Sequence, residues 1–350
     1  MKTRRGNVYP VVGAPTTSRR KRLKPSTSSA RYDFFNMLPD DIVLSVLVRL
    51  ASTADGPADF VAALMTCKRF NGLGVNSLVL AKASAETFAV KAENWSAGAH
   101  RFLQRCSDAG NVEASYTLGM VQFYCFQNTK TGAALMAKAA IRSHAPALYS
   151  LAIIQFNGSG GSKSVKDLNC GVILCARAAF LGHIDALREL GHCLKDGYGI
   201  AKNTTGGQRF LIEASARELS AICSNRSPEL VSGERLSLHA FLLGANANPA
   251  ITCSQLISDF GFSLQPPESH PANRFLAGWF GIRSLDPALR VCSYGGCGRP
   301  ETRVHEFRRC SVCGVMSYCS RGCQARDWRM GHIRNCVPTV RFLNNNDGGS

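Results

Sequence analysis

The chain has 350 residues, of which 45% are hydrophobic and 19% are charged, a composition that excludes a chain disordered throughout. Its net charge of +17 is uneven: residues 1–31 contribute +9, residues 32–291 contribute +3, and residues 292–350 contribute +5. The longest apolar stretch (147–156) has about ten residues, whereas a membrane helix needs about 20. The basic start has no apolar stretch behind it, so we expect a soluble intracellular protein without a secretory signal.

Residues 1–31 lack any hydrophobic period, and we predict a disordered basic tail. A compact cationic cluster in this tail suits a nuclear-import receptor, through Arg19, Arg20, Lys21, Arg22 and Lys24. The alternatives are a solvated charged tail, an organelle transit peptide, or direct nucleic-acid binding that weakens steeply with salt. Because most of the excess charge belongs to the tail, a broad nucleic-acid surface is not expected. We predict a nuclear protein that is also present in the cytoplasm.

Residues 34–80 predict three short helices. Leu38, Pro39 and two acids mark a helix start, and apolar residues follow at helical spacing up to Leu50. A seven-residue loop (52–58) separates this helix from a second one that begins at Ala58, and a third apolar stretch spans 73–80.

This region resembles an F-box, through the segments LPDDIVLSVLVRL (38–50) and CKRF (67–70). The resemblance implies docking on the SKP adaptor of a cullin–RING ubiquitin ligase. By position, the docking residues would be Leu38, Pro39, Ile42, Leu44 and Leu47. A plain helical cap on the next domain is the alternative, and the loop at 52–58 is longer than the F-box pattern leads one to expect.

Residues 110–217 contain an internal repeat, preceded by connecting helices at 81–109. The segments ASYTLG (114–119), ALYSLA (147–152) and ALRELG (186–191) align, and each precedes a second small-residue helix, at 137–140, 176–179 and 213–216. Leu118 and Leu151 lie 33 residues apart, and Leu151 and Leu190 lie 39 apart. Small residues at helical spacing let two helices approach closely, so the pattern predicts an α-solenoid of helical hairpins.

The repeats resemble Sel-like repeats, relatives of the tetratricopeptide repeat, which implies a concave surface offered to another protein and no chemistry of its own.

Residues 218–291 are the least informative region. Within them, Gln265–Pro271 is proline-rich and predicts a linker, and the apolar segment 275–282 is expected to pack on one of its neighbours.

Seven of the fifteen cysteines fall between Cys292 and Cys336. Together with one histidine they give eight soft or borderline ligands, which is the number that two tetrahedral structural zinc sites require. A segment of this size cannot build an adequate core, and zinc would supply the stability, on the order of 10–16 kcal/mol per site. Four protein ligands leave no open position on the metal, so catalysis by zinc is not expected. A disordered tail is predicted at 337–350.

The order of ligands resembles the MYND zinc finger. That resemblance implies a cross-braced topology with Cys292, Cys297, Cys319 and Cys323 on one ion and Cys310, Cys313, His332 and Cys336 on the other. The first pair is C-x4-C instead of C-x2-C, and His305 is a possible substitute ligand. In the family, Gln324 and Trp328 would line a groove for proline-containing peptides, unless Trp328 merely packs over the zinc loop. Six arginines indicate acidic or phosphate ligands, or balance the thiolate charge: Arg308, Arg309, Arg321, Arg326, Arg329 and Arg334.

The fold class expected is therefore mainly α, with a three-helix F-box unit, an α-solenoid and a small two-zinc finger. No catalytic motif of the Walker, GxSxG or HExxH kind is present, so we expect no enzyme. The order of the three modules resembles a plant family of F-box proteins and implies an adaptor that recruits a protein substrate to an SKP–cullin ligase. The alternative is a nuclear scaffold or transcriptional co-regulator that uses the finger alone.

Overall fold

The computed structural model describes residues 34–225 and 268–338. The chain divides into two compact units, Met1–Pro39 and Asp40–Ser350, and the first has one described helix, α1 (Phe34–Met37). Within the described residues, no helix is long and apolar enough to cross a membrane. The basic cluster predicted to direct nuclear import, Arg19 to Lys24, lies outside the described residues, as does the predicted C-terminal tail from residue 339 onward.

A group of four short helices opens the second unit: α2 (Asp40–Thr53), α3 (Pro57–Thr66), α4 (Lys68–Gly74) and α5 (Ser77–Lys82). α2 buries Val43, Leu47 and Ala51, which recur every four residues and therefore lie on one face. The third predicted helix is divided into α4 and α5, because the Asn76 side chain accepts a hydrogen bond from the Leu78 amide and starts a new helix there.

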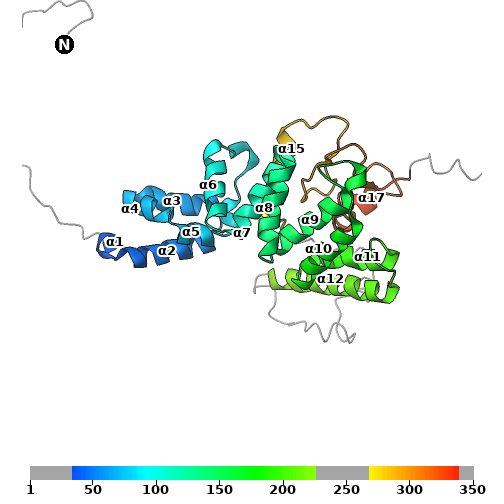
Figure 1. Ribbon diagram of the computed structural model, residues 1–350, viewed down its shortest axis with the longest axis horizontal. Coiled ribbons are helices and arrows are strands. Elements are labelled where there is room, and N and C mark those ends of the chain that lie inside the picture. Colours follow the sequence, from blue (N-terminus) through cyan, green and yellow to red (C-terminus); the bar gives the residue numbers. More distant parts are fainter. Residues whose placement is uncertain (1–33, 226–267, 339–350) are drawn as a thin grey trace, which may run out of the picture. The chain divides into compact units, whose positions relative to one another are not determined.

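The repeats form a stack of helical hairpins in which consecutive helices pack side by side, as Figure 1 shows. The first helices of the hairpins are α7 (Val112–Met120), α9 (Ala145–Asn157) and α11 (Ile184–Asp196). The second helices are α8 (Thr129–Ile141), α10 (Leu168–Phe180) and α12 (Thr204–Asn225), and α6 (Ala97–Asp108) precedes α7 in the same way. Short turns join them: η1 (Glu86–Phe88), η2 (Ala92–Asn94), η3 (Val121–Cys125) and η4 (Lys163–Val165).

Each first helix begins at a side chain that caps it, at the same position of the repeat. Asn111, His144 and His183 each accept a hydrogen bond from the backbone amide three residues later. A capping side chain satisfies one of the amides that the first turn leaves without a partner. The three capping residues are therefore 33 and 39 residues apart in the sequence, the same spacing as that of the aligned leucines.

Small residues set the distance between the two helices of a hairpin. In the third hairpin, a Cβ atom added at Gly207 would lie 2.6 Å from the carbonyl oxygen of Gly191. In the first hairpin, one added at Gly119 would lie 3.0 Å from the carbonyl oxygen of Gly132. Backbone approaches backbone at both crossings, which explains the small residues that the repeat pattern keeps there.

The last described segment contains α15 (Pro271–Ile282) and a compact finger. Pro271 was expected in a linker, but it is the first residue of α15, where its missing amide hydrogen costs nothing. α15 packs through Phe275 and Trp279 on Val121 of the repeats. The finger has two short antiparallel strands followed by helical turns: β1 (Arg308–Arg309), β2 (Ser317–Tyr318), α16 (Arg321–Asp327), η6 (Trp328–His332) and α17 (Ile333–Asn335).

Candidate metal centre

The finger brings eight ligand side chains into two groups of four. The first group is buried and consists of Cys292, Cys297, Cys319 and Cys323. The second consists of Cys310, Cys313, His332 and Cys336. The ligand atoms of each group lie within 4.8 Å of one another. These are the two sets that the MYND resemblance implied. Their members alternate along the chain, so the two groups connect overlapping segments of the finger.

The local structure explains how the ligands converge. Cys319 directly follows β2, and Cys323 lies in the first turn of α16. The Ser320 hydroxyl accepts a hydrogen bond from the Cys323 amide at 3.0 Å and caps that helix. In the second group, Cys310 follows β1 and His332 ends η6. The alternative ligand His305 belongs to neither group, and its Nδ1 accepts a hydrogen bond from Arg309 at 2.9 Å.

The distances fit tetrahedral zinc and exclude disulfides. In the first group, the sulfur of Cys319 lies 3.5 Å from that of Cys297 and 3.6 Å from that of Cys323. In the second group, His332 Nε2 lies 3.4 Å from Cys310 Sγ and 3.7 Å from Cys313 Sγ. Tetrahedral Zn²⁺ places two sulfurs about 3.8 Å apart and a sulfur and a nitrogen about 3.6 Å apart. A disulfide needs about 2.05 Å.

A buried guanidinium favours the thiolate form of Cys297 in the first group. Arg299 donates one hydrogen bond to Cys297 Sγ at 3.5 Å and another to Ser150 Oγ of α9 at 2.8 Å. Hydrogen bonds from the neighbouring thiols, together with Arg299, hold the pKa of Cys297 well below its usual range. Burial would lower the pKa of Arg299, but the thiolates outweigh burial and raise it. Because metals bind the thiolate form, this environment suits a metal site.

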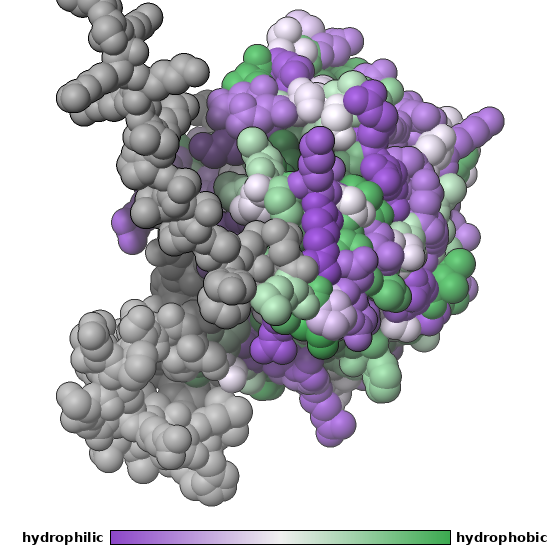
Figure 2. All heavy atoms as spheres, turned by 90° about the vertical axis from the view of Figure 1, so that its left-hand side faces the viewer, coloured by the Kyte–Doolittle hydropathy of each residue, from purple (hydrophilic) through white to green (hydrophobic). Residues whose placement is uncertain are grey.

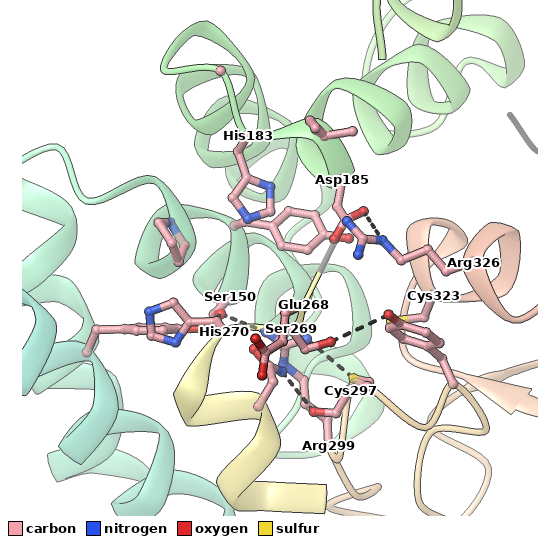
Figure 3. A pocket seen from close by; sticks show the side chains of 18 residues that line it. Ser150, His183, Asp185, Glu268, Ser269, His270, Cys297, Arg299, Cys323 and Arg326 are labelled. Atoms are coloured by element: carbon pink, nitrogen blue, oxygen red, sulfur yellow. Dashed lines mark hydrogen bonds and ion pairs between the residues drawn. The ribbon is translucent and has the colours of Figure 1, made fainter. Parts of the chain in front are cut away.

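The finger is fixed on the repeats by ion pairs with their first helices. Arg326 of α16 donates to Asp185 of α11 at 2.8 Å, and Figure 3 shows its side chain reaching across to that carboxylate. Arg321 also pairs with Asp196 at the end of α11. Of the six finger arginines, these two and Arg329 pair with acids of the repeats, so they join the finger to the solenoid instead of being left for an outside acidic ligand.

Two buried acids reinforce this junction. Glu189 of α11 accepts hydrogen bonds from the backbone amides of Arg321, at 2.8 Å, and Gly322 at the start of α16. Glu218 of α12 accepts from Arg329 of the finger, at 2.6 Å, and from Arg188 of α11, at 2.9 Å. Burial raises the pKa of Glu189, although Arg308 and Arg321 act against it. Because an unpaired buried charge is costly, the last repeat and the finger depend on each other.

A third cluster joins α15 to the first repeat. Glu113 of α7 accepts hydrogen bonds from Nε2 of His144, at 3.0 Å, and from Nε2 of His270, at 3.1 Å. Glu113, His144 and His270 lie close enough to hold a metal ion. However, Nδ1 of each imidazole accepts a backbone amide hydrogen, from Ala147 and Ala272 respectively, so the neutral ring carries its proton on Nε2. A proton on Nε2 blocks metal binding there, and this arrangement favours a hydrogen-bonded latch over a metal site.

Where the repeats, α15 and the finger meet, they line an open pocket of about 310 Å³. His183 and Asp185 contribute to its wall from the repeats, and Arg299 and Arg326 from the finger, as Figure 3 shows. Tyr149 of α9 also lines it. The expected concave surface of the solenoid is therefore covered at its first helices by α15 and the finger.

The residues predicted to bind partners have different surroundings. Gln324 and Trp328 are half-buried, and the Trp328 ring lies 5.6 Å from that of the metal ligand His332. Leu38 and Pro39 link α1 to α2. Leu44 is half-buried and Ile42 is exposed, whereas Leu47 is completely buried in the core, which contradicts its prediction as a docking residue.

The exposed apolar residues of this region lie on α2 and α3. They are Ile42, Val46, Val61 and Met65. Figure 2 views the molecule from the side on which these helices lie and shows hydrophobic residues at the surface among hydrophilic ones. Sequence reasoning missed Val46, Val61 and Met65 as candidate contacts, and it also missed Asp185, Glu189 and Glu218. The charged pair Arg188–Glu189, set between the apolar Leu187 and Leu190 of α11, was the available signal for Glu189.

Two family models match the chain: one for plant tetratrico peptide repeats over residues 86–179, and one for the MYND finger over residues 292–336. The F-box protein At1g67340 of Arabidopsis thaliana is 58% identical over 326 residues, covering 91% of this chain and 84% of that protein. The chain belongs to this family of F-box proteins. A second Arabidopsis thaliana member, the F-box protein At5g50450, is 53% identical over 324 residues, covering 92% of this chain and 90% of its own length.

Among solved structures, a Sel1 repeat protein from Oxalobacter formigenes is 24% identical, with a TM-score of 0.31. It covers 33% of this chain and 86% of its own. This member of the F-box protein family combines tetratricopeptide-like repeats with a MYND finger that carries two clusters of side chains able to hold metal ions.

Proposed function

We propose that this F-box protein is the substrate-recruiting subunit of an SKP–cullin ubiquitin ligase. The observation that carries the proposal is the exposed apolar surface of α2 and α3, in a chain whose close relatives are F-box proteins. Ile42, Val46 and the half-buried Leu44 would contact an SKP-type adaptor, together with Leu38 and Pro39. The protein supplies no chemistry of its own. It raises the effective concentration of the target beside the ligase.

A binding measurement with purified SKP adaptor and cullin tests this proposal. Ile42→Asp combined with Val46→Asp places charge on the exposed face of α2, and we expect at least a ten-fold loss of affinity. Val165→Asp is the matched control, because Val165 is similarly exposed but lies on the repeats. Circular dichroism of each variant checks folding. Equal binding by the double variant, or no binding by the folded wild type, would favour the nuclear scaffold instead.

We propose that each cysteine cluster holds one structural zinc ion. The sulfur and nitrogen separations and the favoured thiolate at Cys297 support zinc, and four ligands in each cluster leave no position for a reacting water. Metal analysis of the purified chain should give two zinc ions per molecule. One ion per chain, or a different metal, would contradict the proposal.

The finger is proposed to take proline-containing peptides through the accessible parts of Gln324 and Trp328. Trp328→Ala should weaken binding of such a peptide while the zinc content stays at two ions, since Trp328 contributes no ligand atom. Loss of zinc in that variant would instead assign Trp328 to packing on the second cluster.

Nuclear localisation is proposed from the cluster of Arg19, Arg20, Lys21, Arg22 and Lys24. A fluorescent fusion of the full chain with these five residues changed to alanine should leave the nucleus. Unchanged nuclear fluorescence would refute the role of the cluster.

A further inference from the structure

The repeats carry a surface on their second helices that the proposed function does not yet use. The first helices contact the finger through Ser150, Asp185 and Glu189, and the N-terminal cap of α15, His270, through Glu113. Among residues 34–225 and 268–338 no such cover lies on Ile141 of α8 or Phe180 of α10, whose side chains are 76% and 88% exposed. Ile141 and Phe180 occupy the same position of consecutive repeats, three residues before the capping histidines. Large apolar side chains repeated at one exposed position are typical of a contact surface.

A row of cations runs beside these apolar residues. Arg105 of α6, Lys138 of α8 and Arg177 of α10 are exposed, and each lies six residues before the cap of the next first helix. Their spacing of 33 and 39 residues equals that of the repeats, so they occupy equivalent places on α6, α8 and α10. Within the described part of the chain, none of the three forms an ion pair with an acid. The Lys138 ammonium donates to the Ser107 carbonyl oxygen at 2.6 Å, which holds it beside α6.

The row ends at the third hairpin. The equivalent residue of α12 is Glu213, which pairs with Arg217, and the place of Phe180 is taken there by the small residue Ala216. On α6, the place of Ile141 is taken by Asp108. The surface is therefore bounded, with three cations and two large apolar side chains on α6, α8 and α10, and we call it the outer ladder.

We propose that the outer ladder binds an extended segment of a partner protein that carries acidic residues alternating with large apolar ones. Charge complementarity selects acids for Arg105, Lys138 and Arg177, and the exposed Ile141 and Phe180 select apolar side chains. The cations recur once per repeat, and an extended segment can present acids to them at a regular interval. The apolar residues favour a peptide over a nucleic acid, which offers charge but no large aliphatic side chains.

A role of the outer ladder in substrate recruitment rests on the proposed adaptor function. The affinity of the outer ladder for a peptide is measured without the SKP adaptor. The probe is a fluorescein-labelled 12-residue peptide of four Glu-Leu-Ser repeats, titrated with the full chain and followed by fluorescence anisotropy. A Lys-Leu-Ser peptide and a 12-nucleotide single-stranded RNA are the comparison probes. We expect the acidic peptide to bind at least ten-fold more tightly than either comparison probe, and to bind less tightly as salt rises.

Two variants separate the contributions. Arg105→Glu combined with Arg177→Glu reverses the charge of the row, and Phe180→Ser removes the larger apolar contact. Each of these two variants should bind the acidic peptide at least ten-fold more weakly than the wild type does. Lys202→Glu, at an exposed lysine between α11 and α12, is the matched control and should change affinity less than two-fold. The proposal is overturned if the wild type does not bind the acidic peptide, if RNA binds more tightly, or if the ladder variants bind it like the control. Binding of these variants to the SKP adaptor, measured in parallel, reports separately on the adaptor function.

Discussion

Glu113 shows how a single carboxylate can join two parts of the fold. Burial would raise its pKa, but hydrogen bonds from His144 and His270 outweigh burial and lower that pKa to about 2. A carboxylate whose pKa is lower in the folded state stabilises the protein above its ordinary pKa, near 4.5, and loses that contribution as the pH falls toward 2. The latch between α15 and the first repeat should therefore weaken in acid.

Glu113→Gln tests this at the residue scale. At pH 7 the amide accepts from one imidazole only, and its NH₂ group opposes the other Nε2–H, so we expect a loss of about 2 kcal/mol in the free energy of unfolding. The difference from wild type should shrink between pH 5 and pH 2, because the wild-type carboxylate becomes protonated there. Denaturant unfolding at several pH values measures the difference, from which any zinc loss common to both proteins cancels. Glu93→Gln, at an exposed carboxylate, should show no such trend.

At the scale of elements, the closeness of paired helices depends on glycine. Gly207→Ala would place a Cβ atom 2.6 Å from the Gly191 carbonyl oxygen and 2.8 Å from the Lys195 amide nitrogen, and neither backbone atom can rotate away. We expect a loss of about 1–3 kcal/mol in the free energy of unfolding.

The matched control is Gly281→Ala in α15, where an added Cβ meets no atom within 4 Å. Helix propensity should make that variant neutral or more stable by up to about 1 kcal/mol. If the two variants unfolded with equal free energies, the crossing between α11 and α12 would have to be looser than described.

The elements also differ in how well the sequence predicted them. The hairpins were predictable, because the alanine and glycine pattern recurs in each repeat, at spacings of 33 and 39 residues. The two metal clusters were predictable in composition, because ligand spacing and a family resemblance both bear on them. Which face of α2 is buried was not predictable, since Ile42 and Val43 are both apolar and only tertiary packing selects Val43. The role of α15 was also missed, because its partners Glu113 and Val121 lie about 150 residues away in the sequence.

At the scale of the whole molecule, the finger packs on the last repeat and is structurally coupled to it. Glu189, Asp185 and Glu218 of the last repeat depend on groups of α16 and η6, which the metal clusters hold in place. Removing zinc should therefore loosen the repeats as well as the finger.

Hydrogen exchange with and without a strong zinc chelator measures this coupling. We expect faster exchange in α11 and α15 in addition to residues 292–336, because the buried acids of α11 lose their partners and Asn273 of α15 loses its hydrogen bond to the Cys297 carbonyl oxygen. The α2–α5 helices serve as the internal control and should exchange as before. If faster exchange were confined to residues 292–336, the finger would be an independent module.

The hydrogen bond from Asn157 to the Cys319 carbonyl oxygen joins residues 162 positions apart in the sequence. A ribosome adding about 5–20 residues per second needs roughly 8–30 seconds to bring the second partner out after the first. During that interval the first-helix face of each nascent repeat lacks its C-terminal cover, and its buried carboxylates lack their cations. Synthesis therefore passes through a stage in which this face is open to chaperones, and an mRNA truncated before the cysteine cluster would yield a chain that remains at that stage.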